Sequence, residues 1–258
     1  MNVIQPLFHV KELLRQLYGN LLCPQDCLLC GSRSGTGLPI CEYCIKTELE
    51  PYIGTADREG TLHRAPRCRH CGKMLISEIG YCTRCRSAGE NAAGKPFSSC
   101  SRIFTLFPYI GLGQKLLPVW KNDGLRTFSA VFAPLVYRFL IQADIARLPV
   151  VPVPPRPRKL RERGWDQVED LVKDLAAYPS LTIHRCLKRQ DGNSQKKLSK
   201  AERATNLQGK ISSTVKTAPD TVVLLDDVMT TGATLEACAR VLHAAGCKKV
   251  YGLCLFFV

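Results

Sequence analysis

The sequence predicts an α/β protein in which a parallel β-sheet is flanked by helices, preceded by a small cysteine-rich module. Residues 222–225 are four consecutive apolar residues, the pattern of a strand that is buried on both faces, and such strands are typical of parallel sheets. Patterns of strands and helices alternate through residues 97–258, which indicates βαβ units with right-handed crossovers. Eight cysteines in two equally spaced sets define the module before them.

The chain of 258 residues is long enough for one ordinary domain and a small one. A stretch rich in Gly and Ala at 87–96 follows the last cysteine of the two sets, so we expect a boundary there. We therefore expect an amphipathic N-terminal helix over 1–22, the cysteine-rich module over 23–95 and the α/β domain over 97–258. The sequence has no run of about 18 uncharged apolar residues, so we expect no transmembrane helix.

The elements of the α/β domain follow from the spacing of apolar residues, which is short and continuous in strands and periodic in helices. After the strand at 221–225, Leu235, Cys238 and Leu242 fall on one helical face, and Gly246 supplies a stop. In chain order, we expect strands at 103–108, 149–153, 181–186, 221–225 and 249–255, and further helices at 112–120, 125–142 and 167–177.

The cysteine-rich module contains one arrangement twice: two CxxC pairs separated by ten residues. Two such pairs place four thiolates tetrahedrally, which is the geometry of a closed structural zinc site. No ligand position is left open, so we expect two structural Zn²⁺ ions that stabilise the fold and do not catalyse. The predicted ligands are Cys27, Cys30, Cys41 and Cys44 in the first set, and Cys68, Cys71, Cys82 and Cys85 in the second.

A disulfide framework is the competing interpretation of these cysteines. Residues 1–22 carry charges inside an amphipathic pattern and do not form a signal peptide, and a reducing cytoplasm disfavours disulfides. Pairing within each set is the simplest arrangement because the loops are short, but an interleaved cross-brace stays open. Cys23 could replace Cys27 as a ligand, and His70 could serve in the second set.

Two adjacent carboxylates, Asp226 and Asp227, directly follow the buried strand, at the carboxyl end where open α/β sheets bind ligands. Behind them a loop rich in Thr and Gly leads into a helix and offers amides and hydroxyls to a phosphate. Carboxylates that accept hydrogen bonds from two hydroxyls beside a phosphate cradle suit a ribose 5′-phosphate. The predicted binding residues are Asp226, Asp227, Met229, Thr230, Thr231, Gly232, Ala233 and Thr234.

Two further segments complete the predicted site. Residues 151–167 combine a proline-rich turn with several arginines, so we expect a rigid loop that binds the ligand through Pro154 and Arg156. Its arginines, Arg163 among them, would clamp a diphosphate; a basic surface loop is the alternative. Residues 190–209 are polar and long for a loop inside a compact domain, which is typical of a lid or a disordered segment.

The chain is strongly basic, with 36 Lys and Arg against 22 Asp and Glu and a net charge of +14. This excess favours polyanions such as nucleic acid or multiply phosphorylated substrates, but charge alone does not decide between them. Arginines near the second cysteine set suit phosphate contacts, whereas we expect Tyr43 and Tyr81 to pack the small module rather than to stack bases. The arginines are Arg67, Arg69, Arg84 and Arg86.

The strand, acid pair and loop at 222–235 resemble the signature of type I phosphoribosyltransferases that binds PRPP (5-phosphoribosyl 1-diphosphate). The double cysteine set, Val-Pro-Val-Pro at 151–154, Arg-Gly-Trp-Asp-Gln at 163–167 and the spaced polar residues of 195–206 extend this likeness. Together they resemble the ComF family (ComFC-type) over about residues 27–246. These are competence or DNA-utilisation proteins with a zinc-binding N-terminus and a phosphoribosyltransferase-like domain.

The resemblance implies a type I phosphoribosyltransferase-like sheet, PRPP bound with Mg²⁺, and a cytoplasmic bacterial protein linked to competence, DNA uptake or the use of exogenous DNA. Asp226 and Asp227 would hold the ribose, and Arg163 with Arg203 the leaving diphosphate. The family's lid motif falls on Gln195, Leu198, Arg203 and Asn206, and its Lys-x-x-Gly motif on Lys121 and Gly124.

The sequence departs from the family pattern at two points. Asp166 stands where the family has Asn, which exchanges an amide donor for a carboxylate that only accepts hydrogen bonds when it is ionised. The C-terminus ends in apolar residues without the basic residue of many relatives, which a strand docked in the sheet would explain.

Two functions remain open at this stage. One is a phosphoribosyltransferase that moves the phosphoribosyl group to an acceptor that the sequence does not specify. The other is a protein that binds PRPP or a nucleotide without turnover and holds single-stranded DNA on its zinc module and basic face. Other competence proteins are possible partners, and the oligomeric state is open. A purely structural scaffold would leave the phosphate loop unexplained.

Overall fold

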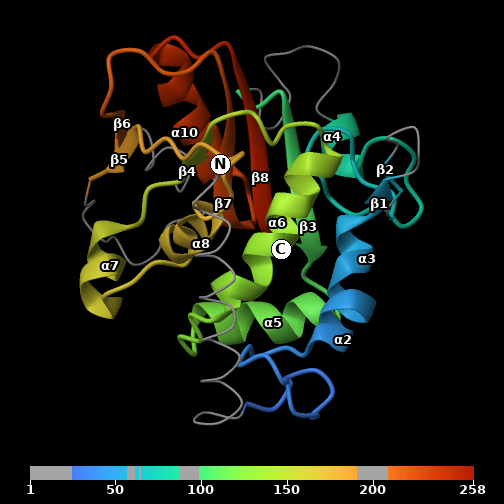
Figure 1. The fold of residues 1–258 in the computed structure, drawn as a ribbon. Helices are drawn as coiled ribbons and strands as arrows, with labels where there is room; N and C mark the ends of the chain where they lie inside the picture. Colours follow the sequence, from blue (N-terminus) through green and yellow to red (C-terminus); the bar gives the residue numbers. More distant parts are fainter. Residues whose placement is uncertain (1–24, 57–61, 64, 88–98, 191–208) are drawn as a thin grey trace, which may run out of the picture.

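Four parallel strands form the central sheet, in the order β3-β8-β7-β4 (Figure 1). The strands are β3 (Arg102–Pro108), β8 (Lys249–Phe257), β7 (Thr221–Met229) and β4 (Val150–Pro152). The predicted α/β class and the parallel sheet are therefore confirmed. This computed structural model describes residues 25–56, 62–63, 65–87, 99–190 and 209–258.

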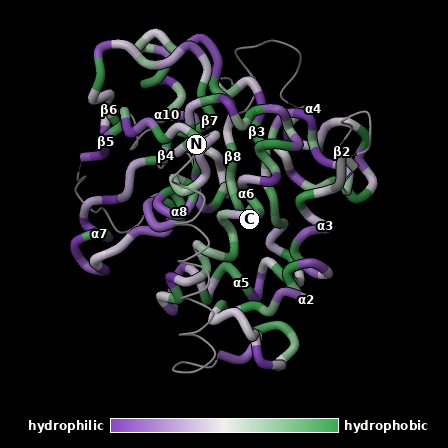
Figure 2. Tube along the Cα trace, viewed as in Figure 1, coloured by the Kyte–Doolittle hydropathy of each residue, from purple (hydrophilic) through white to green (hydrophobic). Residues whose placement is uncertain are grey.

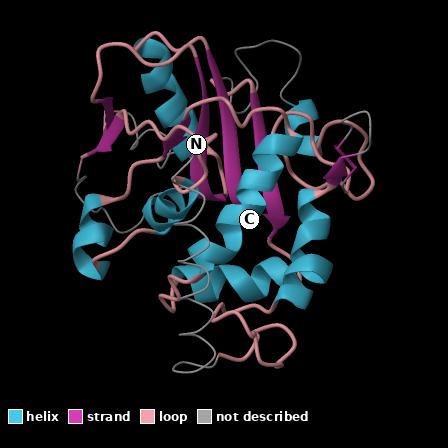
Figure 3. Cartoon of the chain, in the orientation of Figure 1, coloured by secondary structure: helices cyan, strands magenta, loops and turns pink. Residues whose placement is uncertain are grey.

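Helices cover both faces of the sheet (Figure 3). On one face lie α5 (Leu112–Lys121), α6 (Phe128–Gln142) and α8 (Gln167–Leu175), and on the other lies α10 (Ala233–Ala244). The helices predicted from periodicity are thus present, although α6 begins three residues later than expected. Residues 125–127 form a turn instead, after Gly124 with its positive φ of 73°.

Side chains of β7 alternate between two buried clusters, as the pleat of a strand requires. Val223 and Leu225 pack with α5, α6 and α8, whereas Val222 and Leu224 pack with α10. Figure 2 shows the hydrophobic residues concentrated along the sheet strands and the helix faces beside them. Among the described residues, no helix is both long and apolar enough to span a membrane.

The strand predicted at 181–186 is wrong. Only Ile183 pairs with the sheet, through an isolated bridge to Val150 in which Val150 N donates to Thr182 O and His184 N donates to Val150 O, both at 2.8 Å. The next bond of this ladder would need the N–H of Pro152, which proline lacks. The chain instead leaves the sheet and forms β5 (Leu187–Arg189), antiparallel to β6 (Ile211–Ser213).

The segment predicted as a rigid loop at 151–167 contains a helix. After the prolines, α7 (Pro157–Arg163) begins with Pro157 at its first turn and ends at Gly164, which has a left-handed φ of 75°. Pro at the start and Gly at the end are the residues that favour these two positions. The basic residues of this segment therefore project from a short helix rather than from an extended loop.

The cysteine-rich module consists of short elements. It contains α2 (Glu42–Cys44), a π-helical turn η1 (Ile45–Leu49), α3 (Glu50–Ile53), the strand pair β1 (Thr55–Ala56) and β2 (Leu62–His63), and α4 (Thr83–Ser87). The predicted helix at 1–22 and the predicted boundary at 87–96 fall largely outside the described residues, so the domain limits stay predictions.

The two cysteine sets pack against opposite faces of the sheet. Cys27, Cys41 and Cys44 belong to the buried cluster that contains α5 and α6, whereas the second set belongs to the cluster that contains α10. The second set also covers the edge of β3, because the carbonyl of His70 accepts from Ile103 N at 2.8 Å and the carbonyl of Gly72 accepts from Thr105 Oγ1. Both sets are thus integrated into the core around the sheet.

Gly72 makes the closest of these approaches. A Cβ at this position would lie 2.8 Å from both Ile103 O and Thr105 N, whereas a Cβ at Gly31, the matching residue of the first set, would meet nothing within 4 Å. Both glycines have a left-handed φ, 71° and 73°. Only Gly72 therefore combines a backbone requirement with a steric one.

We expect Gly72→Ala to destabilise the protein more than Gly31→Ala. Each Ala should cost about 1–2 kcal/mol for the left-handed backbone, and Gly72→Ala should add about 1–3 kcal/mol because β3 must move. Chemical denaturation of zinc-loaded protein measures both changes. Equal losses of unfolding free energy in the two variants would contradict the contact between the second cysteine set and β3.

Candidate functional site

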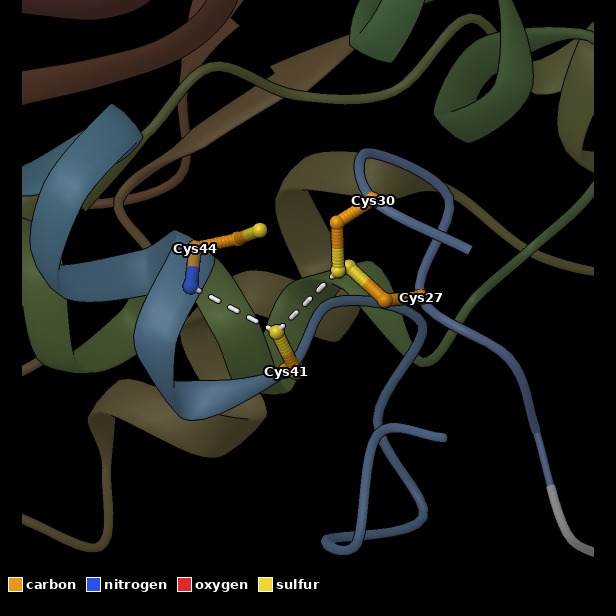
Figure 4. Close-up of side chains that lie close together, drawn as sticks. All are labelled: Cys27, Cys30, Cys41 and Cys44. Atoms are coloured by element: carbon orange, nitrogen blue, oxygen red, sulfur yellow. Dashed lines mark hydrogen bonds between the residues drawn. The ribbon is translucent and has the colours of Figure 1, made fainter. Parts of the chain in front are cut away.

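The first cysteine set gathers at one point. Figure 4 shows the side chains of Cys27, Cys30, Cys41 and Cys44 converging, and their sulfur atoms all lie within 4.8 Å of one another. The Sγ atoms of Cys30 and Cys41 are 3.7 Å apart. Four thiolates at a Zn–S distance near 2.3 Å would be separated by about 3.8 Å, so the donor set and its spacing fit a tetrahedral zinc site.

The second set forms an equivalent cluster of Cys68, Cys71, Cys82 and Cys85, in which the Sγ atoms of Cys71 and Cys82 are 3.6 Å apart. Each cluster takes its four thiols from one set, so the interleaved cross-brace is wrong. His70 is not part of the second cluster, and Cys23 lies outside the described residues. With four thiolates each, both clusters have the closed donor set of a structural site.

The acid pair with the loop after it and the basic segment at 151–167, both predicted to bind a ligand, line one cavity of about 300 Å³. Its walls come from the exit of β4, from α7 and the start of α8, from β5, and from the end of β7 with the loop after it. The lining residues are Lys121, Val153, Pro154, Pro155, Arg156, Lys159, Arg163, Trp165, Asp166, Gln167, Val168, Arg189, Asp226, Asp227, Val228, Thr230 and Thr234.

The acid pair lies on the part of β7 that extends beyond β4. The β4–β7 ladder stops at Leu225, while β7 continues along β8 to Met229. Asp226 is 8% exposed, and burial raises its pKa well above the ordinary value of Asp, with a further contribution from the neighbouring charge of Asp227. Burial therefore favours the neutral form of Asp226.

Asp227 is held by an ion pair in which Lys121 Nζ lies 2.8 Å from Asp227 Oδ2. Lys121 ends α5, and its carbonyl accepts hydrogen bonds from Arg163 Nη1 at 2.8 Å and Gln167 Nε2 at 3.1 Å. One network thus connects α5, α7 and α8 to the carboxylate of β7. Lys121 neutralises Asp227 at the position where a ligand would bind.

Thr230 of the loop after β7 and Thr234 of the first turn of α10 line the cavity. Gly232, with φ of 75°, is the N-cap residue of α10, so backbone amides of this loop occupy a helix N-terminus. The buried Met229 is not in the lining, and neither are Thr231, Gly232 and Ala233.

The second cysteine cluster also contacts this loop. Arg84, which lies between Cys82 and Cys85, donates from Nη2 to Thr231 O at 3.3 Å. Arg67 is not available for phosphate contacts, because it is largely buried and donates from Nη2 to Leu106 O at 2.7 Å. The expectation that Tyr43 and Tyr81 pack the module is wrong, since they are 72% and 44% exposed.

Several cations line the cavity together with the acid pair. Arg156 and Arg163, predicted from the sequence, are joined by Lys159 and Arg189, which the sequence reasoning missed. Burial lowers the pKa of Lys159, and the positive charges of Arg156 and Arg163 lower it further. Burial also lowers the pKa of Arg189. The spacing 156, 159 and 163 is one face of a helix, a signal that would have identified Lys159 if α7 had been recognised.

Asp166 has a local structural role. Its carboxylate accepts from Val168 N at 3.0 Å and Glu169 N at 3.2 Å, so it is the N-cap of α8. Asn and Asp serve about equally well as N-caps, which explains how Asp can stand where the family has Asn. Burial raises the pKa of Asp166 despite these hydrogen bonds. The remaining predicted site residues, Gln195 and Arg203, lie outside the described residues, as do Leu198 and Asn206.

Comparisons with known proteins agree with this geometry. Residues 168–257, from α8 to the end of β8, match the family described as "Phosphoribosyl transferase domain". The chain is 27% identical over 226 residues to "Competence protein ComFC" of Streptococcus pneumoniae. This match covers 87% of this chain and 96% of that protein. The chain is ComF-like. It is also 26% identical over 195 residues to "Competence protein F" of Haemophilus influenzae, which covers 72% of this chain and 82% of that protein.

The ComF likeness and the two clusters together support a zinc-ribbon module joined to a phosphoribosyltransferase-like domain. Phosphoribosyl ligands would bind at the carboxyl ends of the strands in such a domain, which is where the cavity lies. The family match begins after α7, so Arg156, Lys159 and Arg163 belong to a wall that the matched region does not include.

We expect the purified protein to contain two zinc ions per chain, and Cys82→Ser to contain one. Structural zinc can contribute on the order of 10 kcal/mol of apparent folding energy, so Cys82→Ser should also lower the melting temperature strongly. Elemental analysis with protein quantification measures the stoichiometry. Cys247→Ser is the control, because Cys247 Sγ donates weakly to Asp220 O and lies outside both clusters, and it should retain two ions. A metal-free wild type with paired disulfides would contradict the assignment.

We expect Asp226→Asn to raise the stability of the ligand-free protein at neutral pH. The pKa of Asp226 is raised in the folded state, so its burial costs nothing while the group is protonated. Stability is then lost as the pH rises from about 4, the pKa of Asp in the unfolded chain, through the higher pKa of the folded state. The variant avoids this loss, which is about 1.4 kcal/mol for each unit of upward shift.

Thermal unfolding as a function of pH tests this expectation. The advantage of Asp226→Asn should disappear near pH 4 and grow toward neutral pH. Asp220→Asn is the matched control, because Asp220 is 72% exposed and forms an ion pair with Lys248 at the surface, where such pairs contribute little. A lower melting temperature for Asp226→Asn at neutral pH would show that burial of the Asp226 carboxylate does not destabilise the folded protein.

Proposed function

We propose that this protein binds PRPP and uses it as a phosphoribosyltransferase linked to competence. The observation that carries the proposal is that one cavity is lined by the acid pair, by Thr230 and Thr234 at the start of α10, and by several cations. These three sets of groups match the ribose hydroxyls, the 5′-phosphate and the diphosphate of one molecule. The relatives named as competence proteins support the biological context.

In this proposal Asp226 and Asp227 accept hydrogen bonds from the two ribose hydroxyls. Thr230 and Thr234, with the amides at the start of α10, hold the 5′-phosphate. PRPP would enter with Mg²⁺, which supplies positive charge to the diphosphate and would be held at Asp226 and Asp227. Because Lys121 already pairs with Asp227, binding must displace or share that ammonium group, and the diphosphate is its natural new partner.

The chemistry relies on position and charge rather than on a general base. As the bond between C1′ and the diphosphate breaks, the ribose becomes oxocarbenium-like and negative charge builds up on the leaving group. Arg156, Lys159 and Arg163 line the same cavity as the acid pair and would stabilise that charge. The predicted leaving-group residue Arg203 and the lid residue Gln195 complete the proposal as sequence-based assignments.

A second function, binding of single-stranded DNA without turnover, has one observation in its favour. Tyr81 lies within the second cysteine set and is 44% exposed. The exposed Arg84 follows it by three residues, and the exposed Arg69 bonds through its backbone to the neighbouring Gly80. An exposed aromatic ring among arginines suits base stacking with phosphate contacts. This surface is separate from the lining of the cavity, so the two functions can be tested separately.

We expect calorimetry to detect PRPP binding in the presence of Mg²⁺, and the double variant Asp226→Asn, Asp227→Asn to weaken it at least about 100-fold. Each charge-assisted hydrogen bond contributes about 1.5–3 kcal/mol, so losing two corresponds to more than two powers of ten. Asp220→Asn should bind like the wild type. Zinc-loaded, folded protein that gives no heat with PRPP would refute the proposal.

Turnover and DNA binding are then distinguished by the same double variant. An enzyme releases diphosphate from PRPP in the presence of an acceptor, and the double variant loses that release. A DNA-binding module shows affinity for single-stranded DNA that falls steeply with salt and survives the double change. Diphosphate release that is unaffected by the double variant would place the reaction outside this cavity.

A further inference from the structure

The helix α10, which begins beside the cavity, is contacted at both ends by Ser99, three residues before β3. Ser99 donates from its backbone N at 3.2 Å and from Oγ at 2.7 Å to the carboxylate of Glu236, in the first turn of α10. The carbonyl of Ser99 lies 2.8 Å from Nε2 of His243, in the last turn. The helix is therefore held in place along its length by the chain that enters β3.

Arg84 of the second cysteine set adds a contact at the loop before α10. It lies in α4 between Cys82 and Cys85, where the backbone N atoms of Cys85 and Arg86 both donate to Cys82 O at 3.0 Å. The guanidinium of Arg84 donates from Nη2 to the carbonyl of Thr231 at 3.3 Å. Because the cysteine cluster fixes the backbone on both sides of Arg84, this hydrogen bond ties the loop to the cluster.

The peptide between Thr231 and Gly232 benefits from such a restraint. Glycine adopts left-handed and right-handed backbone conformations about equally readily, so Gly232, with φ of 75°, does not by itself fix this peptide. In a planar trans peptide, the carbonyl of one residue and the N–H of the next point in opposite directions. By holding the Thr231 carbonyl, Arg84 therefore also fixes the direction of the Gly232 N–H.

The amides of this loop are the groups that a phosphate would use. The first N–H groups of a helix have no partner within the helix, and they favour anions. Thr230 and Thr234, which line the cavity, lie on either side of the restrained peptide in the sequence. Arg84 is not among the described residues of that lining, so it would affect a bound ligand through the loop rather than by contact.

We propose that Arg84 is a positioning residue for the 5′-phosphate: by holding the Thr231 carbonyl, it keeps the amides before α10 in the orientation that binds the phosphate group. This rests on the proposed function, in which the 5′-phosphate binds at this loop. The inference goes further because it assigns the cysteine-rich module a part in ligand binding besides its part in stabilising the fold.

Calorimetry of zinc-loaded protein with ribose 5-phosphate tests this role. Arg84→Ala should weaken the affinity about 2- to 12-fold, which is the effect of one hydrogen bond on a binding equilibrium. Arg86→Ala is the matched control. It removes the same charge from an exposed position of the same helix, and Arg86 has no contact with the loop among the described residues, so the affinity should stay at the wild-type value.

Hydrogen exchange of the ligand-free protein, followed by NMR, gives a readout that a simple loss of charge or of overall stability would not give. Arg84→Ala should speed the exchange of the amides of residues 232–235, because the loop loses its restraint. The amides of the central strands β7 and β8 should keep their wild-type protection. Arg86→Ala should leave both groups of amides unchanged.

The outcomes separate this inference from the proposed function. Wild-type affinity of Arg84→Ala for ribose 5-phosphate, or weaker binding with unchanged exchange at 232–235, would overturn the positioning role alone. Equal weakening by Arg86→Ala would assign the effect to charge and overturn that role as well. Absence of binding of both ribose 5-phosphate and PRPP to the wild type would overturn the proposed function and the positioning role with it.

Discussion

The parallel direction of β4 and β7 constrains where the polar groups of the candidate site can lie. Because parallel strands end at the same edge of a sheet, the proline-rich exit of β4 and the acid pair of β7 are brought together there. β4 stops at Pro152 while β7 continues to Met229, so Asp226 and Asp227 extend past their neighbouring strand. The cavity of about 300 Å³ lies beside this extension, and its other lining residues come from α7, the start of α8, the end of α5 and β5.

Burying two adjacent carboxylates at that edge is unfavourable, and the surrounding structure compensates only in part. Lys121 neutralises Asp227, whereas Asp226 has no described side-chain cation within ion-pair distance and its pKa is raised by burial. The cations of α7 and β5 leave the cavity with an excess of positive charge. A ligand that combines hydroxyls with phosphate groups would interact favourably with both the carboxylates and the cations.

The cysteine clusters stabilise the same sheet from both sides. A four-stranded sheet has two edges with unpaired backbone groups, and β3 is covered by the second cluster through His70 and Gly72. Arg84 extends this cluster to the carbonyl of Thr231, so the second cysteine cluster contacts the loop before α10. The second cysteine cluster and the loop that borders the cavity are thereby connected through one short path of contacts.

Local patterns in the sequence determined the parallel sheet, the two cysteine clusters and the acid pair, because apolar runs and CxxC spacings depend only on near neighbours. Tertiary structure alone decided the rest. Lys121 and Asp227 pair across 106 residues, Arg189 reaches the cavity from β5, and the missing N–H of Pro152 ends the pairing of residues 181–186. These contacts depend on which segments the folded chain brings together, and periodicity carries no information about that.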